Sequence, residues 1–271
     1  MTKGSNSPQP SLHTTRGHPP RLHISRLGIV SRNYRHRYEN GYRDFSQSLP
    51  GVLRLLDKQG CDAALFSLFS VVPRESFDVQ ACFKNVRSIK AVLFEEFHHG
   101  NERCPSRYVV YHKTKNGWKE YEFEQVFSTL TGIKEDLIRD FVNKEMPQRV
   151  LGNCCVLLCG ESNGVKYSPK IREVHDLYGM TRAIPEHVKI ILNPIHDRMT
   201  RFEMNLKRKF LSRNNRWVVS VWNKGKKFKD GKARDGDGPA WTVFRDGKEV
   251  LVERLPNELG VEIGTLDIQH A

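Results

Sequence analysis

The chain has 271 residues, which is long enough to bury a substantial core as one large domain. Its 44 Lys and Arg outnumber its 31 Asp and Glu, and the formal net charge of +13 favours acidic partners, of which nucleic acid is the commonest. No apolar run approaches the roughly 18 residues that span a bilayer, so no membrane partner is expected. The N-terminus lacks the apolar core of a signal peptide, which predicts a cytoplasmic protein with reduced cysteines.

Residues 1–26 are predicted to form a flexible basic arm, followed by one domain over residues 27–271. The arm is rich in Ser, Pro, His and Arg and poor in apolar side chains, so it buries too little surface to offset its ordering entropy. After a first strand at residues 27–30, Arg alternates with Tyr34 and Tyr38. This alternation fits base stacking and phosphate pairing, and it fits equally well a surface loop with half-buried tyrosines.

The pattern over residues 45–149 alternates helical and extended periodicities. Apolar side chains spaced at three and four predict a helix over residues 45–58, which Gly60 ends. Another helix is predicted over residues 133–146 and is ended by Pro147. The predicted strands are residues 62–69, 89–94, 108–112 and 118–127, with a hairpin turn at residues 115–117.

The second half of the chain alternates strands with helices. Its apolar runs are residues 154–158, 188–192 and 217–222, which end in Cys159, Asn193 and Asn223. Consecutive crossovers predict a sheet covered by helices, with its chemistry where the strands end.

A helix over residues 200–211 is predicted from Phe202, Leu206 and Phe210, which recur every four residues and should face the core. Its outer face and the glycine-containing loop after Asn223 would form a basic surface for nucleic acid. The residues of that predicted surface are Arg201, Lys207, Arg208, Lys209, Lys226 and Lys227.

The order "VLLCGE", "IILNP", amphipathic helix and "WVVSVWNKG" resembles the second half of the carbon–nitrogen hydrolase (nitrilase) superfamily. Residues 241–252 and 261–267 are similar to the closing hairpin and last strand of that family, so the resemblance covers residues 150–268. It implies an α/β fold, the αββα sandwich, with mixed sheets and helices on the outer faces. It also implies a small-molecule amide or nitrile substrate, a homo-oligomer and no cofactor.

The resemblance implies that Cys159 is the nucleophile, because a thiolate at a strand end can attack an amide or nitrile carbon. The family's general-base Glu falls on Leu68 of this chain, and its oxyanion-stabilising Lys falls near Gln125. Candidates for the proton transfer are therefore Glu161, which is two residues from Cys159, and two residues at other strand ends, Glu95 and His196. The alternative is that Cys159 is a small buried residue in a fold whose catalytic set has decayed.

The second function class is a binding module without turnover, which presents its basic surface to nucleic acid or to a protein. Nitrilase-like domains attached to reverse transcriptases in bacterial antiviral systems give that context a family precedent. A zinc site is not expected: Cys155 and Cys159 would lie about 13 Å apart on a strand, too far to bind one tetrahedral ion together.

Overall fold

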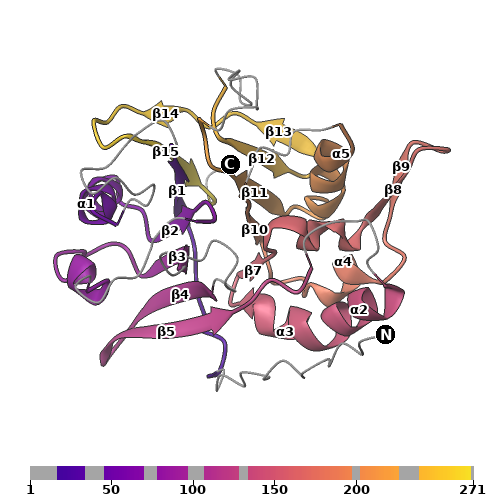
Figure 1. Ribbon diagram of the computed structural model, residues 1–271, viewed down its shortest axis with the longest axis horizontal. Helices are drawn as coiled ribbons and strands as arrows, with labels where there is room; N and C mark the ends of the chain where they lie inside the picture. Colours follow the sequence, from indigo (N-terminus) through magenta and orange to yellow (C-terminus); the bar gives the residue numbers. More distant parts are fainter. Residues whose placement is uncertain are drawn as a thin grey trace, which may run out of the picture.

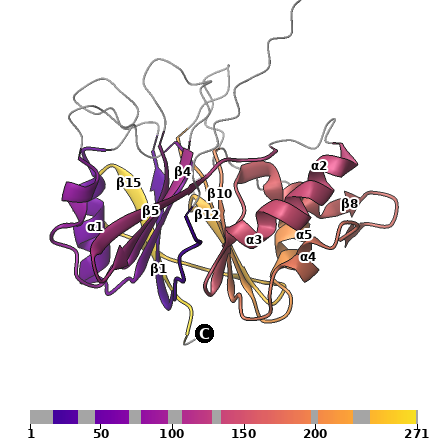
Figure 2. The same ribbon diagram turned by 90° about the horizontal axis from the view of Figure 1, so that it is seen from below.

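Two mixed β-sheets pack face to face, and helices cover their outer faces (Figures 1 and 2). The structure is a computed structural model that describes residues 17–33, 46–69, 78–96, 107–127, 134–196, 202–225 and 238–269. Buried side chains from both sheets form one inner cluster, and each outer face packs its own cluster against helices. The four layers confirm the predicted αββα sandwich.

The first sheet has a parallel centre with antiparallel strands on both sides. Its strands, in spatial order, are β14 (Arg254–Leu255), β15 (Val261–Asp267), β1 (Arg26–Arg32), β2 (Ala63–Phe66), β3 (Ala91–Glu96), β4 (Arg107–Thr114) and β5 (Gly117–Phe123). Strands β1, β2 and β3 are parallel, whereas β15 and β4 run antiparallel to the strands beside them. The hairpin between β4 and β5 pairs Thr114 with Gly117, which confirms the predicted turn.

Helix α1 (Leu49–Lys58) covers the outer face of the first sheet together with the 3-10 helix η1 (Gln80–Phe83). Its buried residues are Leu49, Val52, Leu53 and Leu56. Gly60 follows with a φ of +70°, so the predicted helix and its stop are both confirmed. The helix packs closely on β1, because a Cβ at Gly28 would meet the Leu56 side chain at 2.6 Å.

The second sheet carries the crossover units predicted for the second half of the chain. Its strands, in spatial order, are β13 (Lys248–Val250), β12 (Trp241–Arg245), β11 (Trp217–Val221), β10 (Ile190–Pro194), β7 (Cys154–Val156) and β6 (Val150–Leu151). Strands β7, β10 and β11 are parallel neighbours. The predicted crossovers are therefore confirmed.

The outer face of the second sheet is covered by short helices and a hairpin. These elements are α2 (Glu135–Asp140), the π-helix η2 (Phe141–Glu145), α3 (Met146–Arg149), the 3-10 helix η3 (Cys159–Gly164), β8 (Lys166–Ser168), β9 (Glu173–His175), α4 (Met180–Ala183) and α5 (Phe202–Leu211). The prediction that Pro147 ends a helix is wrong, because it lies in the first turn of α3, where a missing N–H is tolerated.

Residues 17–25 fall within the range predicted as an arm, and they lie against the sandwich. Ile24 is buried in the inner cluster, and the Asn153 side chain bonds both its N–H and its carbonyl oxygen, each at 2.9 Å. Residues 1–16 lie outside the described residues. Within the described ranges, no helix has the length and apolar character needed to cross a membrane.

Candidate active site

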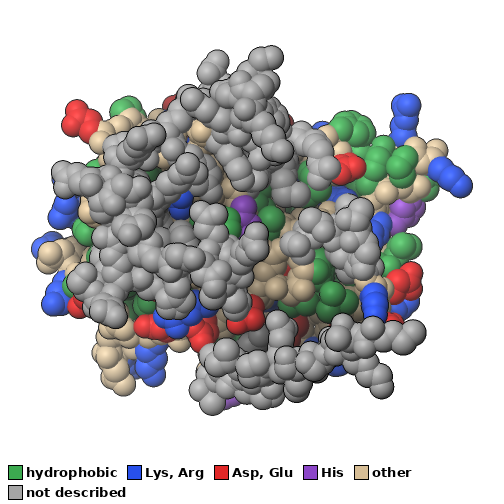
Figure 3. All heavy atoms as spheres, viewed as in Figure 1, with side chains coloured by type: hydrophobic (Ala, Val, Ile, Leu, Met, Phe, Trp, Pro, Cys, Tyr) green, Lys and Arg blue, Asp and Glu red, His purple; other side chains and the backbone are tan. Residues whose placement is uncertain are grey.

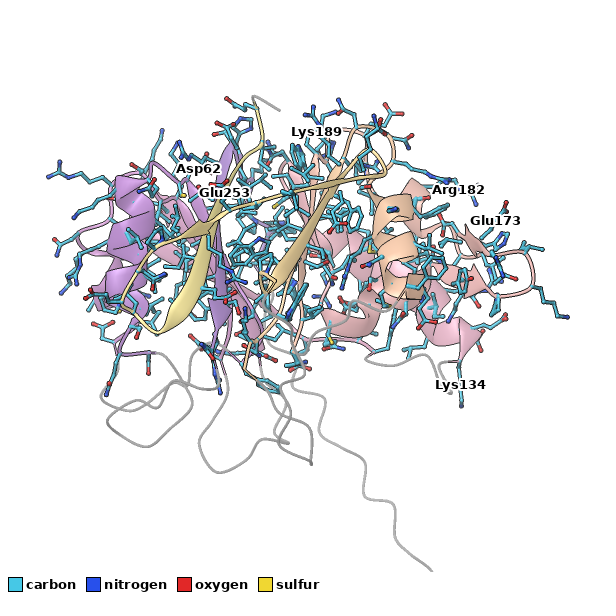
Figure 4. All side chains as sticks on the ribbon, turned by 90° about the horizontal axis from the view of Figure 1, so that it is seen from above. Asp62, Lys134, Glu173, Arg182, Lys189 and Glu253 are labelled. Atoms are coloured by element: carbon cyan, nitrogen blue, oxygen red, sulfur yellow. The ribbon has the colours of Figure 1, made fainter. Side chains whose placement is uncertain are left out.

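The candidate site lies where parallel strands of both sheets end. Asp62 and Lys189, which precede β2 and β10, lie at the opposite edge of the sheets, where these strands begin (Figure 4). Cys159 follows β7, His196 follows β10, and Glu95 lies near the end of β3. Parallel strands bring their carboxyl ends to one edge, which places these three residues together although their sequence positions are far apart.

Glu95, His196 and Cys159 interact in series. Glu95 Oε2 lies 3.2 Å from His196 Nε2, and the Cys159 side chain interacts with the His196 ring and raises its pKa. Three of the residues predicted to be catalytic are therefore brought together. A thiol, an imidazole and a carboxylate in series is the arrangement by which a base activates a nucleophile and is itself oriented by a third group.

Glu95 reaches this position because β3 alternates its side chains between two faces. Leu93 faces the inner cluster and Phe94 the outer one, so Glu95 points between the sheets. The next residue, Glu96, points outward, where it accepts hydrogen bonds from Tyr111 at 2.9 Å and Arg107 at 2.8 Å. The Glu95 carboxylate therefore lies between the two sheets, and the adjacent Glu96 carboxylate lies on the outer side of the first sheet.

Phe69, which the sequence did not single out, fixes the Glu95–His196 pair. Its backbone N–H donates to Glu95 Oε2 at 2.7 Å, and its ring lies 4.0 Å, centroid to centroid, from the imidazole of His196. Phe69 has a φ of +57°, which is uncommon for a residue with a side chain. No periodicity could have indicated it, since the contact depends on this turn conformation.

His196 is poised as a cation at neutral pH. Burial lowers its pKa, but hydrogen bonds to Cys159 and to the Glu95 carboxylate outweigh burial and raise the pKa to about 9. The side chain is 25% exposed, so bulk solvent still reaches the ring. A group of this pKa holds its proton at pH 7 and can deliver it to a leaving group.

Cys159 differs from the two cysteines that precede it. Cys154 and Cys155 are fully buried, and burial raises the pKa of Cys155 to about 12. Cys159 is only partly buried, and it has a φ of +29° at the start of η3. Sparsely populated backbone conformations of residues other than glycine cluster at functional sites, where a turn presents a side chain to a ligand.

Glu161 anchors the turn that carries Cys159, and it does not take part in the series of Glu95, His196 and Cys159. It is 0% exposed, and its carboxylate accepts hydrogen bonds from Arg149 Nη2 at 2.9 Å, Val126 N at 2.9 Å and Leu158 N at 2.8 Å. Burial raises its pKa, while Arg149 and the two backbone donors act against that rise. With both oxygens engaged in this way, Glu161 is suited to holding η3 in place.

The two positions that match the family's Glu and Lys carry no ionisable group in this chain. Leu68 is buried and donates its backbone N–H to Ile195 O at 3.4 Å. Gln125 donates from Nε2 to the carbonyl oxygen of Phe127 at 2.8 Å, a local bond that does not involve Cys159. The structure therefore brings Glu95 and His196 to Cys159, whereas Gln125 bonds Phe127 and adjoins Val126, whose backbone N–H donates to Glu161.

Asn223 bonds two loops, the one that follows β2 of the first sheet and the one that follows β10 of the second. Its Nδ2 donates to Leu68 O at 2.8 Å and to His196 O at 2.9 Å, while its Oδ1 accepts from Ser67 Oγ at 2.8 Å. Asn223 ends the strand that resembled the family's last crossover strand. Its place at a predicted strand end indicated Asn223 as a candidate for the site, but it did not indicate which groups the side-chain amide would bind.

The predicted orientation of α5 is wrong. Phe202 is 66% exposed, whereas the buried residues are Met204, Lys207, Arg208 and Leu211, at the i, i+3, i+4 and i+7 spacing of a single face. Lys207 and Arg208 therefore point inward because they have polar partners there. Lys207 Nζ donates to Asn163 Oδ1 at 2.7 Å and Arg208 Nη1 to Thr242 Oγ1 at 3.1 Å.

This burial also corrects the predicted nucleic-acid surface, because Lys207 and Arg208 are each 1% exposed and face the interior, so they are not part of the outer surface of α5. Lys209 is exposed, and Arg201, Lys226 and Lys227 lie outside the described residues. Figure 3 shows Lys and Arg side chains among Asp and Glu side chains on the face it presents. The antiviral context remains a prediction drawn from the resemblance.

Within the described part of the chain, no group of three or more His, Cys, Asp and Glu is placed to hold a metal ion. His98, His99 and Cys104, whose side chains are of the types that bind zinc, lie outside that part.

Known proteins are similar to this chain in structure, without a match in sequence. No family model and no curated protein matches it. Among solved structures, it is similar to a mutant of the amidase from Nesterenkonia sp. AN1 that carries the acetamide moiety of fluoroacetamide covalently added at its active-site cysteine. The two chains are 15% identical, with a TM-score of 0.46 over 93% of this chain and 94% of that one.

Proposed function

We propose that the protein is a cysteine-dependent hydrolase of a carbon–nitrogen bond, of the amidase type. Cys159 carries the acyl group, His196 moves the proton, and Glu95 orients His196. The observation that carries this proposal is that Glu95 Oε2 lies 3.2 Å from His196 Nε2 at the strand ends, while Cys159 interacts with the same imidazole. The sequence resemblance over residues 150–268 supports the same class of reaction.

In the first half-reaction the Cys159 thiolate attacks the carbonyl carbon of an amide and forms a carbon–sulfur bond. The tetrahedral intermediate collapses when the carbon–nitrogen bond breaks, and the leaving amine or ammonia takes a proton from the His196 imidazolium. A thioester on Cys159 and a neutral His196 remain. The pKa of about 9 at His196 supports this step, because the proton to be donated is present at neutral pH.

In the second half-reaction neutral His196 takes a proton from water, and the oxygen attacks the thioester carbon. The carbon–sulfur bond breaks and releases the acid, which restores the thiolate and the imidazolium. Glu95 keeps its charge throughout and stabilises the imidazolium that forms in each cycle. This division of labour differs from the family pattern of Glu and Lys, and it uses the strand ends of β3 and β10 instead.

The test is release of ammonia from a panel of primary amides, together with mass spectrometry of trapped acyl-enzyme. The wild-type chain should turn over and carry the acyl group on Cys159, and Cys159→Ala should do neither. Cys82→Ala is the matched control, because Cys82 is a partly buried thiol in η1, away from the strand ends. Equal ammonia release by wild type and Cys159→Ala, or an adduct on Cys82, would refute the proposal.

A further inference from the structure

Arg208 is a buried cation with one edge of its guanidinium unused. It lies on the inward face of α5 and is 1% exposed. Its Nη1 donates to Asn205 Oδ1 at 3.3 Å and to Thr242 Oγ1 at 3.1 Å. Among the described residues, neither Nε nor Nη2 has a hydrogen-bond partner.

Nε and Nη2 carry the two parallel N–H bonds of a guanidinium, the pair that grips both oxygens of a carboxylate at once. Buried N–H donors in native proteins have acceptors in about 90% of cases or more, because an unmet donor costs about the free energy of desolvation. Two unmet donors on the same edge of one cation therefore indicate a ligand with two acceptor oxygens.

A third unmet donor belongs to Trp222, whose ring lies near the Arg208 guanidinium. The indole Nε1 of Trp222 is buried and, within the described part of the chain, has no acceptor. Its ring centre lies 6.0 Å from Arg208 Cζ. Trp222 directly precedes Asn223, which bonds the backbone of His196, so this group of donors adjoins the catalytic series.

Arg208 is also close enough to Cys159 for their charges to interact. Burial lowers the pKa of Arg208 to about 10, while the negative charges of Glu249 and Cys159 oppose that fall. Glu249 is an exposed residue of β13, so solvent screens its charge and it offsets little of the cost of burying the Arg208 charge. Helix α5 contacts η3, the segment that begins at Cys159.

We infer that the free edge of Arg208, with Trp222 Nε1, binds a carboxylate of the substrate, so that the amide cleaved at Cys159 belongs to a molecule that carries a second, anionic end. This inference rests on the proposed function for the position of the scissile bond. It assigns Arg208 the role of a specificity residue, and it leaves the chemistry to Cys159, His196 and Glu95.

The probes are the monoamide of glutaric acid and its diamide, which share length and scissile group but differ in one charge. Binding to Cys159→Ala is measured by calorimetry, so that turnover is not needed. The monoamide should bind about tenfold or more tightly than the diamide, and Arg208→Lys should abolish the preference, because an ammonium lacks the bidentate edge. Lys209→Met, at the exposed neighbouring cation, should leave the preference unchanged.

In the wild-type background, Arg208→Lys should raise KM for the monoamide about tenfold or more with kcat little changed, and thermal unfolding should show that the variant is folded. Equal binding of the two amides by Cys159→Ala, or an unchanged preference in Arg208→Lys, overturns the inference. Monoamide preference without turnover in the wild type would refute the proposed function alone. Turnover of both amides at equal kcat/KM would refute the inference alone.

Discussion

Glu95, on the first sheet, and His196, on the second, meet at 3.2 Å between Oε2 and Nε2 although 101 residues separate them in sequence. The pair therefore lies across the junction of the two sheets, and each sheet contributes one member. Because Cys159 comes from the second sheet as well, the site exists only when both sheets are packed together. Its geometry depends on the residues that tie their strand ends to one another.

Removal of the Glu95 charge should change the protonation of His196. In Glu95→Gln the side chain keeps its size but loses the carboxylate that stabilises the imidazolium, so the pKa of His196 should fall from about 9 towards the value of about 6.5 for a free imidazole. Amide hydrolysis should fall about tenfold or more. Carbon-13-edited NMR titration of His196 and the pH profile of kcat measure the two effects.

Glu96→Gln is the matched control for that change, because Glu96 is the adjacent carboxylate and serves the outer layer with Arg107 and Tyr111. It should lower stability without moving the titration of His196. A His196 titration unaffected by Glu95→Gln, or shifted equally by both variants, would show that Glu95 does not orient the imidazole.

The raised pKa of His196 also predicts how stability depends on pH. Its folded-state pKa of about 9 exceeds the value of about 6.5 expected in the unfolded chain, so the protonated ring stabilises the fold fully below pH 6.5. That contribution is lost as the pH rises from about 6.5 to about 9, and it amounts to at most about 3 kcal/mol. Urea unfolding at several pH values should show this decline in wild type, and a weaker decline in His196→Gln.

The periodicity of apolar residues predicted most of the helices and strands, whereas their arrangement as a sandwich was implied by the family resemblance. In helix α1 and the strands around it, the apolar residues at the expected spacing are the ones that are buried, so residue pattern and packing agree. Helix α5 shows where this reasoning fails. Its inward face holds Lys207 and Arg208, whose polar partners come from distant elements, and an apolar pattern cannot indicate a cation that is buried because it is bonded.

The members of the candidate site could be named from the sequence, but their roles could not be assigned. Strand ends and proximity to Cys159 identified Glu95, His196 and Glu161 as candidates for the proton transfer, and nothing in the sequence singled out one of them. The contacts distinguish them, because Glu161 is paired with Arg149 and Glu95 reaches His196 from the other sheet. Contacts between sheets depend on the packing of whole layers, which no local pattern records.

The buried pair of Arg149 and Glu161 should be a major determinant of stability. Both side chains are 0% exposed and lie 2.9 Å apart, and the Arg149 guanidinium stacks 4.1 Å from the ring of Phe123. Arg149→Met would leave the Glu161 carboxylate buried without its counter-ion, at a cost of about 3–5 kcal/mol in the free energy of unfolding. Denaturant titration measures the loss.

The exposed ion pair of Lys144 and Asp140, 2.9 Å apart, provides the comparison. Lys144→Met should change the free energy of unfolding by about 0.5 kcal/mol or less. If Arg149→Met costs no more than this control, then the pair does not hold η3, the turn that begins at Cys159.

A homo-oligomer, which the family resemblance implies, has a candidate surface beside the β8–β9 hairpin. Ile171, Leu177 and Phe202 are each more than half exposed, and α5 contacts both strands of that hairpin. Apolar side chains gather over β8, β9 and α5 in Figure 3. Light scattering should give more than one chain per particle at micromolar concentration, and Ile171→Glu with Phe202→Glu should reduce that mass.

Leu251→Glu is the control for this surface, because Leu251 is an exposed leucine that follows β13. It should leave the mass unchanged. A wild-type mass of one chain would contradict the prediction, as would an equal response to all of these substitutions.

Asn223 should affect catalysis through the position of His196 and not through contact with substrate. In Asn223→Ala, the carbonyl oxygens of Leu68 and His196 lose the side-chain donor, and His196 O keeps only the backbone N–H of residue 223, so the loop that carries the imidazole is held less firmly. We expect kcat to fall about tenfold or more with a loss of about 1–3 kcal/mol in stability.

Ser220→Ala removes another buried hydrogen bond, from Ser220 Oγ to Asn193 Oδ1, and should lower stability while leaving kcat largely unchanged. If the two variants lower kcat equally at matched temperatures below unfolding, then the fall in kcat reflects general destabilisation, and Asn223 does not specifically position the imidazole of His196.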